Sequence, residues 1–122
     1  MEESVLKIID GLIKKSQEKK AKWLESSTKG EYKILFHGAT VSIGSFKDAY
    51  GKAYYAMKIF NDEGKVVVKE SFYLTNPSVS KLKELFTCAQ ESCLKKRDTI
   101  DSILTQLSND TVGNLEAVDL PF

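Results

Sequence analysis

Few side chains in this sequence are of a type that does chemistry, and they are scattered along the chain. The sequence has one histidine, His37, and two cysteines, Cys88 and Cys93. None of them stands in a zinc-protease, paired-cysteine or nucleophile-elbow motif. A histidine followed by a glycine is typical of a chain reversal. We therefore interpret His37 as a turn or surface residue and not as a base or a metal ligand.

The two cysteines lie five positions apart in a segment with helical periodicity. On a helix this step turns the two side chains about 140° apart, which is a poor geometry for a disulfide. A nucleophilic cysteine needs a partner base and a lowered thiol pKa, whereas Cys93 falls on the apolar side of the predicted helix. We therefore expect two reduced thiols, and we expect no catalytic residue, no metal and no cofactor.

Features that could bind phosphate groups are weak as well. The glycines at positions 38, 44 and 51 match no phosphate-binding motif, and turns with a strand bulge at Gly44 explain them more simply. Lysines cluster over residues 14–22, but Trp23 is the only aromatic residue beside them, so we interpret them as a solvated helix face. The net charge of +1 gives no bulk attraction to nucleic acid, and binding to nucleic acid is not expected.

Length and composition indicate one ordinary domain. The chain has 122 residues, of which 42% are hydrophobic and 29% are charged. No apolar run approaches the ~18 residues of a membrane span, and the acidic start does not resemble a secretion signal. We expect no membrane contact and a cytoplasmic location.

Periodicity divides the chain into a helix, a sheet and two further helices. Apolar residues at steps of three and four predict a helix over residues 2–22, and residues 26–30 are a predicted loop. Four strands follow, and their short connections favour an antiparallel meander. The expected fold is therefore α+β, a four-stranded antiparallel meander with an N-terminal helix and two C-terminal helices packed on one face. We predict strands at 31–36, 40–46 and within 53–73, helices at 78–95 and 98–108, a single domain over 1–108, and a flexible or loosely docked tail over 109–122.

Residues 53–73 give the strongest signal for a strand, a turn and a second strand. We predict a four-residue loop over 61–64, because this loop places the apolar residues of both strands on one face beneath the helices. A three-residue loop would pair Met57 with Lys69 and would mix the faces. The predicted register pairs Ile59 with Val66, Met57 with Val68 and Tyr55 with Glu70.

The sheet face turned away from the helices mixes aromatic, aliphatic and lysine residues. A purely solvated face is more polar, and Tyr and Phe are enriched in protein interfaces. The alternative is packing within the chain, with lysine stems covering the apolar rings. The candidate interaction face comprises Lys33, Leu35, Tyr54, Lys58, Phe60, Val67, Lys69 and Tyr73.

Several packing motifs together resemble a known group of proteins. They are Trp23 before a Ser-Ser loop, the hairpin pattern YYxMxIFxxxG from Tyr54, the helix around Leu82–Phe86 and the helix over Asp98–Leu107. The pattern resembles small uncharacterised bacterial α+β proteins that are often encoded on phage-derived or mobile DNA. The resemblance covers about residues 20–108. It implies the same order of elements, and it brings no established activity and no catalytic residues.

These observations favour a non-enzymatic protein-interaction module. It would self-associate as a dimer or hold a protein partner through the helix-free sheet face or through an edge strand. The alternative is a small-ligand or nucleotide-binding protein, with a pocket between helix and sheet near His37, Tyr50 and Tyr55. A third possibility, suggested by the resemblance, is an accessory protein that blocks a host or phage enzyme.

Overall fold

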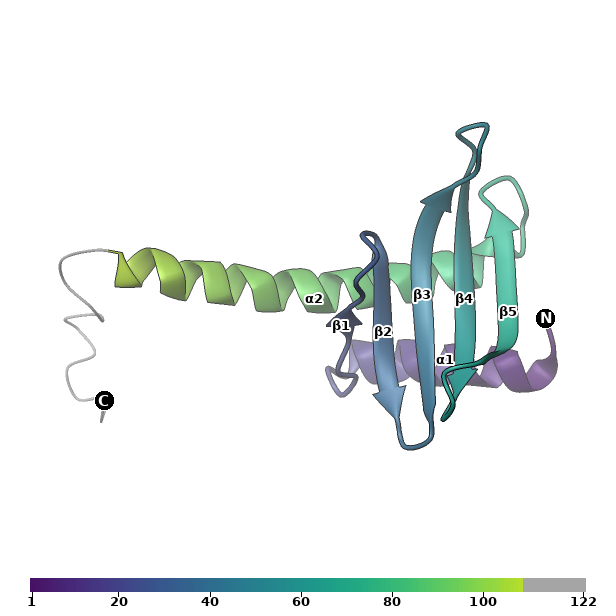
Figure 1. Ribbon diagram of the computed structural model, residues 1–122, viewed down its shortest axis with the longest axis horizontal. Coiled ribbons are helices and arrows are strands. Elements are labelled where there is room, and N and C mark those ends of the chain that lie inside the picture. Colours follow the sequence, from purple (N-terminus) through teal and green to yellow (C-terminus); the bar gives the residue numbers. More distant parts are fainter. Residues whose placement is uncertain (109–122) are drawn as a thin grey trace.

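The structure is a computed structural model that describes residues 1–108, apart from the side chain of Lys96. Both helices lie on the same face of a single sheet (Figure 1). The predicted tail over 109–122 lies outside the described residues. The elements are α1 (Glu3–Gln17), β1 (Leu24–Glu25), β2 (Glu31–Phe36), β3 (Ala39–Lys47), β4 (Ala53–Asn61), β5 (Val66–Tyr73) and α2 (Val79–Leu107).

The predicted α+β class and antiparallel meander are confirmed, whereas the predicted number of strands is wrong. The sheet has five strands in the order β1-β2-β3-β4-β5. The additional strand is β1, in which Leu24 pairs with Lys33 and Glu25 pairs with Tyr32. A strand of two residues is too short to show the alternation of apolar and polar side chains by which strands are recognised in a sequence.

The prediction of two C-terminal helices is also wrong, because α2 is one helix of 29 residues. It continues through the charged segment 95–98, where Lys and Arg are good helix formers and no Gly or Pro interrupts the chain. Asp98, at which the second of these predicted helices begins, therefore lies inside α2. The first helix, in contrast, ends earlier than predicted, at Gln17. Lys19 follows with a φ of 60°, a left-handed conformation that stops the helix.

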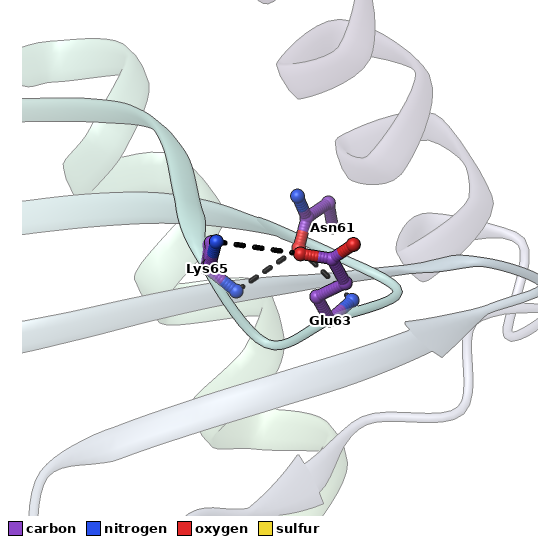
Figure 2. A network of polar contacts seen from close by, with 3 residues as sticks. All are labelled: Asn61, Glu63 and Lys65. Atoms are coloured by element: carbon purple, nitrogen blue, oxygen red, sulfur yellow. Dashed lines mark hydrogen bonds and ion pairs between the residues drawn. The ribbon is translucent and has the colours of Figure 1, made fainter.

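The hairpin of β4 and β5 closes through a three-residue loop and not through the predicted four-residue loop. The backbone N–H of Asn61 donates to the carbonyl of Lys65 at 2.9 Å, and that of Gly64 donates back to the carbonyl of Asn61 at 3.0 Å. Gly64 has a φ of +79°, which this kind of turn requires at its last loop position. Figure 2 shows the Asn61 side-chain oxygen accepting from the backbone N–H groups of Glu63 and Lys65, both at 3.0 Å.

A β-bulge keeps the two faces of this hairpin sorted despite the shorter loop. Phe60 pairs with Val66, but the next pair is Ile59 with Val68, so Val67 is an extra residue. The predicted pairing of Ile59 with Val66 is therefore wrong by two positions. Because side chains alternate with a period of two, this shift leaves Ile59, Met57 and Val68 on their predicted face. Val66, in contrast, was predicted beneath the helices and instead pairs with Phe60 on the helix-free face. The remaining pairs differ in the same way, Met57 with Glu70 and Tyr55 with Phe72.

The core lies between the sheet and the two helices. Its most enclosed side chains are 0% exposed and come from both helices and the central strands: Ile9, Ile43, Met57, Leu82 and Leu85. The predicted apolar stripe of the second helix is buried as far as Cys93. The rings of Tyr32 and Tyr55 pack against Phe86, with centroids 5.7 and 5.2 Å from it. Tyr55, Met57 and Val68 thus lie beneath the helices, as predicted.

Candidate functional site

The helix-free side of the sheet, which we call the open face, carries a row of lysines across four strands. Lys33 pairs with Ser42, Ser42 with Lys58, and Lys58 with Lys69. We call Lys33, Lys58 and Lys69 the lysine row. Ser42 between them is 3% exposed, so the row has a small buried residue at its centre. Among residues 1–108, the observed ion pairs do not involve these three lysines.

An apolar row lies next to the lysine row, towards the hairpin loops. It is two residues further along β2, β3 and β4, and three residues further along β5 because of the bulge. Leu35 pairs with Thr40, Thr40 with Phe60, and Phe60 with Val66. Leu35 is 59% exposed and Val66 is 48% exposed, so both ends of this row are uncovered, whereas Thr40 and Phe60 between them are half-buried. A shallow groove of about 540 Å³ lies over the β2 and β3 part of these two rows and extends to Phe60. Its lining also includes the acidic residues Glu31 and Asp62.

Three rings form an aromatic row near the opposite end of the open face. Tyr54 packs between Phe46 and Tyr73, with ring centroids 5.7 Å apart on both sides. The ring of Phe46 also lies over Gly44, where a Cβ added to the glycine would approach the ring Cζ to 2.5 Å. The predicted bulge at Gly44 is wrong, because Gly44 pairs regularly with both neighbouring strands. The glycine instead makes room for the ring.

The turn between β3 and β4 anchors this aromatic row. Asp48 Oδ1 accepts from the backbone N–H groups of Tyr50 and Lys52, both at 2.9 Å, and Oδ2 accepts from the Tyr73 hydroxyl at 3.0 Å. The N–H of Lys52 is the main cause that lowers the pKa of Asp48. The hydrogen bond to Asp48 raises the pKa of Tyr73. These contacts hold Tyr73 beside Tyr54 and leave 45% of its surface exposed.

The strand pairing places seven residues of the predicted interaction face in these three rows. The eighth, Val67, is the extra residue of the bulge and is 58% exposed. Thr40, Phe46 and Val66 were not predicted as part of the surface. Phe46 lies four residues after Ser42 on the same predicted strand, so the alternation of side chains was sufficient to place it on the same face. The face on which Val66 lies depends on the bulge, and the bulge has no signal in the sequence.

The three residues proposed for a ligand pocket lie at separate places. His37 is exposed in the turn before β3, and Tyr50 is 91% exposed in the turn after it. Nine residues of strand, roughly 30 Å, separate these two turns. Tyr55 packs against Phe86 beneath the second helix. The structure therefore does not bring His37, Tyr50 and Tyr55 together.

The cysteines lie along the packed side of α2. Cys88 is half-buried and Cys93 is buried in the core. Burial raises the pKa of the Cys88 thiol, and the carboxylates of Glu84 and Glu91 raise it further. A raised pKa reduces the fraction of reactive thiolate at neutral pH, so the geometry does not favour Cys88 as a nucleophile.

No family model, curated protein or solved structure matched the chain in the three comparisons. The resemblance to small bacterial proteins therefore stays a prediction. Within residues 1–108, no helix combines the length and apolarity needed to cross a membrane. The same part of the chain contains no group of three or more His, Cys, Asp or Glu side chains placed to hold a metal ion.

Proposed function

We propose that the protein is a non-enzymatic interaction module whose open face binds a protein partner with acidic and apolar groups. The observation that carries this proposal is the lysine row beside the exposed apolar row. Like charges directly opposite one another on a sheet are unfavourable, and Lys58 pairs directly with Lys69. An acidic partner would relieve this repulsion.

The apolar row supports a binding role over simple packing within the chain. Lysine stems can cover neighbouring rings, and Lys33 and Lys58 are indeed half-buried. Leu35, Val66 and Val67 nevertheless remain 48% to 59% exposed. Val66 adjoins Phe60 in this row, and exposed apolar side chains that adjoin one another beside polar ones mark interaction sites.

The charge of the open face argues against self-association through this surface. Two copies placed face to face would bring two lysine rows together without a compensating acidic row, and such like-charge contacts suppress binding. The occupant we propose is therefore a different protein. Its binding would weaken at high ionic strength, because salt screens the attraction to the lysines.

A comparative pull-down tests this proposal. The tagged chain would be incubated with extract of the source cells, alongside Lys58→Glu, Phe60→Asp and the control Lys83→Glu, an exposed lysine on the helical side. We expect a protein that the wild type and Lys83→Glu retain and that both open-face variants lose. Circular dichroism would show that the variants are folded.

Two results would count against a protein partner. If all four chains retain the same proteins, the open face is not the binding surface. If a labelled single-stranded oligonucleotide binds the wild type and is released by Lys58→Glu, the lysine and aromatic rows serve nucleic acid instead.

A further inference from the structure

The second half of α2 projects beyond the sheet and keeps its apolar side chains exposed. The last residue of this helix in the core is Cys93. We call residues 94–107 the α2 extension. Figure 1 shows it leaving the domain past β1, with no other described element beside it. Five large apolar residues on it are 43% to 58% exposed: Leu94, Ile100, Ile103, Leu104 and Leu107.

Four of these residues form a single stripe. Relative to Ile100, the other three lie three, four and seven positions later: Ile103, Leu104 and Leu107. Residues at this spacing share one side of a helix. This spacing is that of a helix packed against another element. We call these four residues the extension stripe.

A cleft lies at the base of the extension and is continuous with the stripe. It has a volume of about 370 Å³ and is lined by Trp23, Leu24, Glu25, Cys93, Arg97 and Ile100. Arg97 and Glu25 form an ion pair that ties the start of the extension to β1. Ile100 belongs both to the cleft and to the stripe, so an element packed on the stripe would also reach the cleft.

We propose that the extension stripe pairs with the same stripe of a second copy of this chain, in an antiparallel arrangement. The midpoint of the stripe lies between Ile103 and Leu104. A two-fold axis at this point places Ile103 opposite Leu104 of the second copy. It also places Leu107 of the second copy opposite Ile100, at the mouth of the cleft beside Trp23. Each copy thus supplies one leucine and one cleft, as a two-fold interface requires.

The helix dipoles favour this direction over a parallel pair, because antiparallel helices place opposite dipole ends side by side. The charges on the extension do not oppose this direction. Lys95, Asp98 and Asp101 lie in its first half, Arg97 is paired with Glu25, and the described residues after Asp101 carry no charge.

The amount of surface available predicts a weak dimer. The shared segment covers two to three helical turns from each copy and the cleft at each end. This is smaller than the roughly 800 Å² per partner of a standard stable interface. We therefore expect dimerisation that depends on protein concentration.

Sedimentation equilibrium of the whole chain tests the interface. We expect the mass to rise from 13.7 kDa towards twice this value with concentration. Leu104→Lys should hold the chain at the monomer mass. The matched control is Leu35→Lys on the open face, since these two leucines are 58% and 59% exposed, and this variant should dimerise like the wild type. Circular dichroism would confirm that both variants are folded.

Three results would overturn the proposal. The first is a wild type that stays monomeric at every concentration, as expected if residues 109–122 of the same chain cover the stripe. The second is a dimer that Leu104→Lys leaves intact. The third is a dimer that only Leu35→Lys abolishes, because the open face would then be the interface.

Cysteine crosslinking tests the direction of the pair. In the antiparallel dimer the two Leu107 positions are about 10 Å apart along the helix axis, beyond disulfide reach. The Ile100→Cys/Leu107→Cys double variant should therefore form covalent dimers on oxidation, whereas Leu107→Cys alone should not exceed the wild type. Efficient crosslinking of Leu107→Cys alone would show a parallel pair and overturn the proposed arrangement.

Discussion

The indole N–H of Trp23 donates a hydrogen bond to the Ser16 hydroxyl at 2.8 Å. The Ser16 hydroxyl donates in turn to the carbonyl of Leu12 at 2.7 Å. Trp23 is only 3% exposed, so water cannot easily replace Ser16 as the acceptor. This pair of residues ties the last turn of the first helix to the chain that enters β1, and it positions one wall of the cleft beside the α2 extension.

Replacing Ser16 with alanine should leave the buried indole N–H without its acceptor. An unsatisfied buried donor costs about 1–3 kcal/mol, so we expect Ser16→Ala to lower the free energy of unfolding by this amount. Urea denaturation followed by the fluorescence of Trp23, the only tryptophan, measures this change. Ser80→Ala, at an exposed position of the second helix, is the control and should differ little from the wild type. Equal effects of the two substitutions would show that the indole bond adds nothing.

The contacts of Asp48 should make stability depend on pH at both ends of the range. Hydrogen bonds lower the pKa of Asp48 in the folded state, so its contribution is present above the unfolded pKa of about 3.9 and is lost as the pH falls through the lower folded pKa. The pKa of Tyr73 is raised in the folded state. Its contribution is therefore present below about pH 10 and is lost as the pH rises through the folded pKa.

The substitution Asp48→Asn removes the negative charge of this side chain but keeps an oxygen that can accept the hydrogen bonds of the turn. Asn61 accepts the same two backbone hydrogen bonds in the other hairpin, so an amide oxygen at position 48 should preserve the turn. We expect the thermal midpoint of the variant to fall less than that of the wild type as the pH drops below about 4. Midpoint curves that run parallel across the whole pH range would contradict this account.

The close approach of the Phe46 ring to Gly44 predicts a steric conflict in Gly44→Ala. The added methyl group would lie 2.5 Å from the ring Cζ, so the ring must leave its place beside Tyr54. Overpacking of this kind costs about 1–3 kcal/mol. In a double-mutant cycle measured by urea denaturation, Gly44→Ala should cost much less in a Phe46→Ala background. Additive effects would show that the ring does not determine the cost.

Two glycines should respond in opposite directions to the same substitution. Gly64 has a φ of +79°, so Gly64→Ala should destabilise the protein by about 1–2 kcal/mol. Gly11 lies inside the first helix with open space around its Cβ position, so Gly11→Ala should stabilise the protein by about 0.5–1 kcal/mol. Thermal unfolding of both variants measures the difference. The same sign for both would refute the backbone argument.

Much of the fold follows from local patterns in the sequence. The alternation in β4 separates Tyr55, Met57 and Ile59 from Tyr54, Lys58 and Phe60, and this separation holds in the structure because alternation depends only on strand geometry. The apolar stripe of the second helix identifies its buried side for the same reason. Seven residues of the three rows could therefore be predicted one by one, whereas Val66, which was expected opposite Ile59, could not.

The arrangement of these residues depends on contacts between distant segments. The bulge at Val67 sets which residues of β5 oppose β4, and with it the alignment of Lys58 with Lys69. Nothing in either strand alone specifies this pairing, because it reflects the packing of both strands against the helices. β1 likewise exists only because Leu24 and Glu25 find partners in β2.

The extension of α2 shows most clearly that a local pattern does not reveal which distant segment will cover it. The sequence by itself determined that Ile100, Ile103, Leu104 and Leu107 share one side of a helix. This periodicity is identical for a helix that packs on the sheet and for one that projects from it. Only the tertiary structure decided between the two, because the sheet ends at β1 while the helix continues, and a pattern of side chains carries no information about where its covering surface stops.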